Sequence, residues 1–268
     1  MSRKGEFAIL CQSDRGGREE RIAHQVALIE DIALKMMSLA EIDGCGAELC
    51  AGRVLPIGGV EFVRRAMTLA QVAEPPNLTY PEVLRPYLRR EVRMRPAGSV
   101  IGRWFVKPTT TKAFTGFVFD TMGSPEQLSC HDREQYEAFM ALAPDVPVWT
   151  AEPVRWVSEV RYYVERGEIL GEGRYDEGPE EVPLPDLPTV REMAGHLAVS
   201  PEAPSAFAID VGVLECGTTA LIEVNDAWAL GYYSGTLSPR RYIEMLWTRW
   251  RELFESNRGI GGFVHATW

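Results

Sequence analysis

Three oxygen-bearing side chains near the carboxyl-terminal end of the sequence have the types and spacing of a magnesium site. Asp210 stands in the segment FAIDVGVL, and Glu223 and Asn225 stand in LIEVND. Both segments favour β-structure, and a turn around Gly217 separates them, so we expect two adjacent antiparallel strands. Side chains two residues apart on a strand point to one face, and Mg²⁺ prefers oxygen ligands. The spacing predicts a Mg²⁺ site; the alternative is that these acids lie at strand ends and pair with arginines.

Two lysines in the middle of the sequence could neutralise phosphate groups. Lys107 ends the apolar segment WFVKP, and Lys112 lies in the following segment TTTKAFTG. A lysine at the end of a strand presents a point charge, and the threonine hydroxyls and backbone N–H groups of the loop can donate to phosphate oxygens. Gly116 permits the backbone to approach a bound phosphate closely. The pattern is not a Walker A loop, and the alternative for a Lys-Pro pair is a solvated surface lysine.

A third group of polar residues lies between these two, in the segment WTAEPVRWVSEVRYYV. We expect Glu152 to accept a hydrogen bond from an adenine amino group, while the backbone of Pro153 and Val154 contacts the edge of the ring. Glu159 is a candidate for binding ribose or metal. Arg161 follows Glu159 by two residues and therefore shares its face of the strand. For each charged side chain taken alone, a surface ion pair is the alternative.

The elements that must position these residues begin with an α/β pattern in the first hundred residues. Apolar runs predict strands at 7–11 and 53–57. Apolar residues at helical spacing predict one helix between 19 and 40 and a second that opens at 58–59. The proline-containing stretch 74–80 is expected to be a loop.

A Gly-Ser break at residues 98 and 99 separates this layer from a strand-rich region. Arg166 and Gly167 predict a hairpin turn, and Ser238 with Pro239 predicts a helix start. We expect an α+β protein with three parts: an α/β domain at 1–98, a central subdomain at 99–152 and a carboxyl-terminal subdomain at 153–268. The expected strands of the last two parts are 104–107, 116–119, 146–149, 157–164, 168–170, 206–214 and 220–224, with a short helix at 190–197.

The composition narrows the class of protein. The 268 residues are 46% hydrophobic, which is enough for a sizeable core. No apolar run approaches the ~18 to 20 residues of a membrane-spanning helix, and the amino-terminal residues lack the apolar stretch of a secretion signal. We therefore expect a cytoplasmic protein without a membrane partner. The net charge of −10 argues against general nucleic-acid binding, because phosphate backbones require a basic face.

Two local features need separate interpretation. The segment from Arg85 to Arg103 carries six arginines against the single acid Glu91, and it is either a solvated face or an attraction for an anionic substrate. The five cysteines are scattered without a C-x-x-C pair, so we expect them to be reduced and mostly buried. Cys130 next to His131 is expected to lie in an ordinary loop, and no zinc site is assigned.

The three groups of polar residues, in this order, resemble the ATP-grasp superfamily over residues 104–233. In D-alanine–D-alanine ligase and its relatives, a strand lysine is followed by a phosphate loop, a connection with two glutamates, and metal ligands in the order D…ExN. Here Glu223 follows Asp210 by 13 residues and Asn225 follows it by 15. The segments FVKP, KAFTG, WVSEVRYYV, DVGV and EVNDAWALG look like the ATP-grasp branch named for one arginine and two lysines.

This resemblance implies a fold and a set of roles. The first hundred residues are similar to the α/β domain that precedes the ATP-binding part in this superfamily, the pre-ATP-grasp domain. Lys107 and Lys112 would neutralise the phosphates of ATP, and Arg161, the arginine of the branch, would contact the γ-phosphate or an acyl phosphate. One or two Mg²⁺ ions would be held by Asp210, Glu223 and Asn225.

The implied activity is that of an ADP-forming carboxylate–amine ligase acting on small-molecule or peptide substrates. Ala208 stands where the D-alanine ligases carry a substrate-binding arginine, so the carboxylate substrate stays undetermined. The alternatives are a small-molecule kinase with the same ATP site and a non-catalytic nucleotide-binding module. A homodimer is left open as the oligomeric state.

Overall fold

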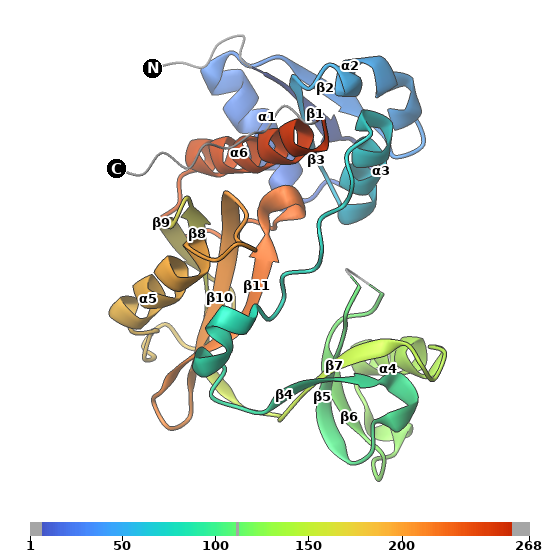
Figure 1. Cartoon of the computed structure of the whole chain (residues 1–268), viewed down its shortest axis with the longest axis vertical. Coiled ribbons are helices and arrows are strands. Elements are labelled where there is room, and N and C mark those ends of the chain that lie inside the picture. Colours follow the sequence, from blue (N-terminus) through green and yellow to red (C-terminus); the bar gives the residue numbers. More distant parts are fainter. Residues whose placement is uncertain (1–6, 111–112, 259–268) are drawn as a thin grey trace.

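The computed structural model describes residues 7–110 and 113–258, which form three parts, each built on its own sheet (Figure 1). The amino-terminal layer has a parallel sheet in the order β2-β1-β3. Its core is formed by the apolar run of β1 together with the apolar faces of α1 and α3. The elements of this layer are β1 (Ala8–Gln12), α1 (Arg18–Glu30), β2 (Leu34–Met37), α2 (Gly46–Cys50), β3 (Val54–Ile57) and α3 (Val60–Ala70).

The expected helix between residues 19 and 40 is wrong in its second half. Helix α1 ends at Glu30, because Asp31 adopts the left-handed conformation with φ 54° that closes a helix. The chain then forms strand β2 instead. Ile29 and Met36 match the helical spacing but are exposed. The buried face of α1 is formed by Ile22, Ala23, Val26 and Ala27 together with Glu20.

The central part is a small antiparallel sheet in the order β4-β7-β5-β6, with α4 packed on it. Its core is aromatic: the rings of Phe117, Phe119 and Phe139 pack edge to face. Helix α4 begins at Cys130 because Ser129 caps it by accepting from the backbone N–H of Asp132. The expectation of a loop at Cys130 is therefore wrong. The elements are β4 (Val92–Pro96), β5 (Arg103–Pro108), β6 (Phe117–Asp120), α4 (Cys130–Met140) and β7 (Pro147–Ala151).

The carboxyl-terminal part is an antiparallel sheet in the order β11-β10-β8-β9. The expected hairpin at Arg166–Gly167 and the expected antiparallel pair around Gly217 are both confirmed. Every residue of β10 is buried, because α5 covers one face of the sheet and α6 the other. The elements are β8 (Trp156–Glu165), β9 (Glu168–Arg174), α5 (Leu187–Ala198), β10 (Ala206–Leu214), β11 (Thr219–Asp226) and α6 (Pro239–Asn257).

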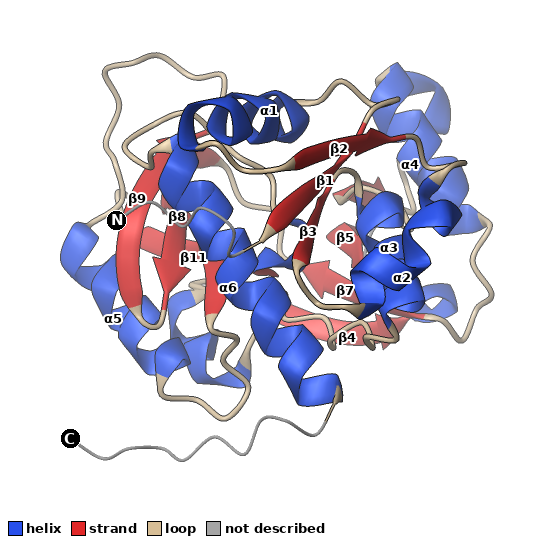
Figure 2. Cartoon of the chain, turned by 90° about the horizontal axis from the view of Figure 1, so that it is seen from above, coloured by secondary structure: helices blue, strands red, loops and turns tan. Residues whose placement is uncertain are grey.

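Helix α6 joins the first and last parts into one body. It starts where the sequence predicts, with the Ser238 hydroxyl accepting from the N–H of Arg241. Its apolar residues pack against the amino-terminal layer in the same core cluster as Tyr163 and Ala208 of the carboxyl-terminal sheet. Figure 2 shows α6 lying between the strands of the two sheets. The central sheet stands apart from this body in Figure 1.

The expected domain limits at residues 98 and 152 stay predictions. Strand β4 precedes residue 98 in the chain, yet it pairs with β7 inside the central sheet. Of the five cysteines, Cys11 and Cys45 are buried, whereas Cys130 and Cys216 are exposed, so the expectation of mostly buried thiols is wrong. Over the ranges 7–110 and 113–258, no helix is long and apolar enough to cross a bilayer.

Glycines in β9 let the segment 231–237 lie directly on this edge of the sheet. A Cβ at Gly173 would come within 2.5 Å of the carbonyl oxygen of Tyr233, and one at Gly171 within 2.6 Å of the backbone nitrogen of Leu237. Gly173 also forms an isolated bridge with Gly235. The sequence places glycine here because any side chain would push the segment away.

We predict that Gly173→Ala destabilises the protein by about 1–3 kcal/mol, because the added methyl group overpacks a backbone contact. The matched control is Gly195→Ala in α5, where a Cβ meets nothing within 4 Å. That change should stabilise the protein by about 0.5–1 kcal/mol through helix propensity. Urea unfolding of both variants measures the difference. A Gly173→Ala protein as stable as the wild type would contradict the close packing.

Candidate functional site

A row of charged residues crosses the carboxyl-terminal sheet, one residue from each of three strands. Arg161 on β8 lies opposite Asp210 on β10, and Asp210 lies opposite Glu223 on β11. Directly opposite residues share a face of the sheet, so the three side chains lie side by side. Asn225 follows Glu223 by two residues and joins the same face.

Arg161 and Asp210 form a buried two-pronged ion pair. Nε of Arg161 donates to Oδ1 of Asp210 over 2.8 Å, and Nη2 donates to Oδ2 over 2.7 Å. Arg161 is 8% exposed and Asp210 is 2% exposed. Burial alone would lower the pKa of Arg161, but the adjacent carboxylate outweighs burial and raises it. Each charge therefore satisfies the other, which is the condition for placing either in a strand buried on both faces.

The amide of Asn225 connects the two carboxylates. Its Nδ2 donates to Oδ2 of Asp210 over 3.1 Å and to Oε1 of Glu223 over 3.0 Å. The structure thus brings together the three side chains expected to bind metal. Two carboxylates on directly opposite residues repel each other unless a cation or donor lies between them, and two carboxylates plus an amide fit the oxygen preference of Mg²⁺. In the described part of the chain, no group of three His, Cys, Asp or Glu could hold a metal, so an amide must supply the third ligand.

A bulge aligns this row. Asp210 pairs with Glu223, but the next residue, Val211, pairs with Leu221, so Ile222 is an extra residue in β11. A bulge bends its strand and changes the direction of nearby side chains. Here it separates Glu223 and Asn225 from the regular alternation that precedes them, and Ile222 becomes part of a cavity wall.

Lys107 reaches this row from the central sheet. Its ammonium group is in direct contact with the carboxylate of Glu223, and this contact bridges β5 and β11. Burial lowers the pKa of Lys107 to about 8, with Asp210 opposing and Arg161 and Arg90 adding to the decrease. The adjacent Glu223 carboxylate favours the charged form. The second expected lysine, Lys112, lies outside the described residues.

A cavity of about 960 Å³ opens between the central and carboxyl-terminal sheets. Lys107, Glu223 and Asn225 line it, whereas Arg161 and Asp210 lie behind that wall. The residues expected to contact a nucleotide base also line it, and these are Glu152, Pro153, Val154 and Glu159. The cavity therefore brings together residues that are as far apart in the chain as Lys107 and Asn225.

Glu159 is held by the residues that follow β9. The hydroxyl of Tyr175 donates to Oε2 of Glu159 over 3.2 Å, and the backbone N–H of Glu159 donates to Asp176 over 2.9 Å. Burial raises the pKa of Glu159, although the bond from Tyr175 opposes the shift. Glu159 is thus a fixed acceptor in the cavity wall rather than a mobile surface acid.

Arg90 is a cavity residue that the sequence reasoning did not single out. Its guanidinium donates to the backbone oxygens of Leu221 and Ile222 over 2.6 and 3.1 Å and lies 5.1 Å from the ring centre of Trp156. In the sequence it belongs to the basic segment 85–103, and its partners are some 130 residues away in the chain. No local signal separates it from its neighbours.

The rest of that basic segment is mostly paired on the surface. Arg85 contacts Glu82, and Arg93 and Arg95 both contact Glu91. Arg95 also lies over the ring of Trp104, 4.3 Å from its centre. These contacts are those of a solvated face.

Apolar side chains in the cavity are a second group that the sequence reasoning missed. Phe105, Trp156 and Ile222 line it together with the charged residues above. Phe105 could have been found, because it precedes Lys107 by two residues on β5 and so shares its face. Ile222 could not, because its position depends on the bulge.

Comparison with known proteins places these features in a family. A family model described as an ATP-grasp domain, family 3 of its clade, matches residues 58–253, well over half of the chain. A search of curated proteins finds no match.

Several solved structures are similar in fold. D-alanine–D-alanine ligase of Bacillus anthracis has a TM-score of 0.51 at 11% identity, and the match covers 93% of this chain and 99% of that chain. N5-carboxyaminoimidazole synthase of Aspergillus clavatus has a TM-score of 0.52 at 14% identity, covering 90% and 77%. D-alanine–D-alanine ligase of Coxiella burnetii has a TM-score of 0.50 at 8% identity, covering 95% and 98%. These identities show the fold alone, and the expected α+β fold is confirmed.

We predict that Arg161→Met destabilises the protein by about 3–5 kcal/mol, because it leaves the Asp210 carboxylate buried without its partner. Arg155→Met is the control, since Arg155 is 81% exposed in its pair with Glu215. That change should cost no more than about 1 kcal/mol. Urea unfolding distinguishes the two. Equal losses in both variants would show that the buried pair is not the stronger contact.

Proposed function

The chain belongs to the ATP-grasp superfamily, and from this premise we propose that it is an ATP-dependent ligase that joins a carboxylate to an amine. The observation that carries the proposal is the row of Asp210 and Glu223, with Asn225 beside it and Lys107 opposite, at one end of a large cavity. Phosphate and metal chemistry both require such a concentration of opposite charges. The two D-alanine–D-alanine ligases among the similar folds support the same class.

In this proposal ATP lies between the central and carboxyl-terminal subdomains. The cavity volume of about 960 Å³ is within the range of small-molecule sites. The adenine ring would lie against Phe105 and Ile222, with Glu152 accepting from its amino group and the backbone of Pro153 and Val154 at its edge. Glu159, a fixed acceptor, would bind the ribose.

The phosphates would extend toward Lys107 and the acidic row. Lys107 and Lys112 would neutralise them, and Arg161 would act on the transferred phosphoryl group from behind the cavity wall. Asp210, Glu223 and Asn225 would hold Mg²⁺. The chemistry that Mg²⁺ supplies when bound is neutralisation of charge on the phosphoryl oxygens. Lys107 must then leave Glu223, and a phosphate is the partner that replaces this carboxylate.

The reaction would pass through an acyl phosphate. A carboxylate is a poor electrophile, because its leaving group would be an oxide ion. In-line transfer of the γ-phosphoryl group to a carboxylate oxygen breaks the bond to the β-phosphate oxygen, releases ADP and makes phosphate the leaving group. The amine then attacks the acyl carbon, and phosphate departs. The substrates are proposed to be small molecules or peptides.

We predict that Lys107→Met weakens ADP binding by about tenfold or more, because it removes a cation from the phosphate site. Lys35→Met is the control, since Lys35 pairs with Glu48 on the exposed side of the amino-terminal layer. Calorimetric titration measures both, and circular dichroism checks the fold. The same design applies to Lys112→Met. If both variants keep wild-type affinity and turnover, the two lysines do not bind phosphate.

We also predict that the products are ADP and phosphate and that ¹⁸O from a labelled carboxylate appears in the phosphate. An ADP-release screen across carboxylate and amine pairs identifies the substrates, and mass spectrometry of the phosphate follows the label. AMP with pyrophosphate would contradict the proposed chemistry. A stable phosphorylated alcohol would indicate the kinase alternative instead.

A further inference from the structure

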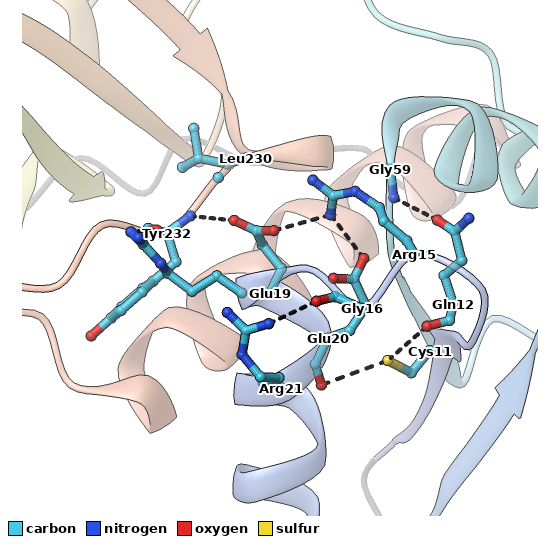
Figure 3. A network of polar contacts seen from close by, with 12 residues as sticks. Cys11, Gln12, Arg15, Gly16, Glu19, Glu20, Arg21, Gly59, Leu230 and Tyr232 are labelled. Carbon is cyan, nitrogen blue, oxygen red and sulfur yellow. Dashed lines mark hydrogen bonds and ion pairs between the residues drawn. The ribbon is translucent and has the colours of Figure 1, made fainter. Parts of the chain in front are cut away.

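The segment Leu230–Tyr233 lies between the amino-terminal layer and the charged row of the carboxyl-terminal sheet. It directly follows β11 and a short helical turn. Figure 3 shows Tyr232 beside Glu19 of α1, which in turn faces Arg15. The segment therefore touches two parts of the molecule that come from opposite ends of the chain.

On the sheet side, Arg161 and Tyr163 hold the carbonyl group of Gly231. Nη1 of Arg161 and the hydroxyl of Tyr163 both donate to this oxygen over 3.2 Å. The same hydroxyl accepts from the backbone N–H of Tyr233 over 2.6 Å. Tyr163 has no exposed surface, so its hydroxyl has two partners and no access to water.

On the other side, the start of α1 holds the next residue. The backbone N–H of Tyr232 donates to Oε1 of Glu19 over 3.0 Å, and Nη1 of Arg18 donates to the carbonyl oxygen of Tyr232 over 3.0 Å. Arg15 pairs with the other oxygen of Glu19 over 3.0 Å. The carboxylate of Glu19 is thus oriented from both of its oxygens (Figure 3).

These contacts determine the orientation of the Arg161 guanidinium. This group is planar, and its Nε and Nη2 donate to Asp210 while Nη1 donates to Gly231. Fixing the carbonyl of Gly231 therefore fixes the plane in which Asp210 is held. The ring of Tyr233, 5.0 Å from the guanidinium carbon, covers one side of it.

The segment cannot easily relax away from this position. Gly173 of β9 lies against the backbone of Tyr233, as described above, so the sheet edge limits movement on that side. Tyr242 of α6 donates its hydroxyl to the carbonyl of Leu230. A displacement of the segment would thus be passed to Arg161 rather than absorbed locally.

We propose that Tyr163 and Glu19 are positioning residues for the metal site. They act through the Gly231–Tyr233 backbone and Arg161 to set the orientation of Asp210. The inference rests on the proposed function, because it assumes that Asp210 binds Mg²⁺. It assigns to the amino-terminal layer, through Glu19, a part in the metal affinity of a sheet that it does not belong to.

The test measures ADP binding by calorimetry over a range of Mg²⁺ concentrations at constant ionic strength. Tyr163→Phe and Glu19→Ala should each raise the Mg²⁺ concentration for half-maximal tightening by about three- to tenfold, the worth of one hydrogen bond. Affinity for ADP in EDTA should change by less than about twofold, because neither residue lines the cavity. Glu19→Gln should restore the wild-type response, since its amide oxygen still accepts from Tyr232.

Tyr162→Phe is the matched control. Tyr162 neighbours Tyr163 on β8 but packs in the core on the other face, against α5, so its Mg²⁺ response should equal that of the wild type. A merely structural role for Tyr163 and Glu19 would lower the melting temperature without moving the Mg²⁺ response, and that result overturns the positioning proposal. A wild-type protein that binds ADP without any dependence on Mg²⁺ would overturn the proposed metal site itself, and the positioning proposal with it.

Discussion

The site depends on one constraint, which is that strand β10 is buried on both faces and yet carries the charge of Asp210. A buried carboxylate is tolerated only with a full set of partners. Arg161 supplies them from the adjacent strand, and the pair can form only in the observed register of β8 and β10. The same register puts Glu223 next in the row. The requirement for one ion pair thus aligns three strands and brings the polar residues to one place.

The remaining charges of the site follow the same rule of internal compensation. Glu223 is balanced by Lys107, and Asn225 donates to both acids. In the proposed function, Mg²⁺ and ATP therefore do not enter an open set of charges. They exchange with contacts that the protein already makes, so that phosphate replaces a carboxylate at Lys107 and a metal replaces an ammonium at Glu223. Such an exchange limits the energy gained by either ligand alone and favours binding of the two together.

Local periodicity makes one part of the site predictable from the sequence. Glu223 and Asn225 share a face because they are two residues apart, and the turn at Gly217 makes the pairing with Asp210 foreseeable. The partner of Arg161 is not foreseeable, because β8 and β10 are separated by α5 and nothing local indicates which strands pair. Arg90 escapes prediction for the same reason, since it bonds to the distant backbone of β11. The helix expected through residue 40 fails because surface residues such as Met36 match the helical period by chance.

The path of the chain makes the central sheet an insertion. The chain leaves the main body before β4 and returns after β7, and at this crossing the backbone N–H of Glu152 donates to the carbonyl oxygen of Glu91 over 2.9 Å. The two ends of the inserted unit are therefore already together, so its length adds little closure entropy to the folding of the body that α6 completes. Two adjacent backbone crossings also form a natural hinge. Rotation about it would open and close the cavity as a jaw, while the acidic row on the fixed sheet keeps its geometry.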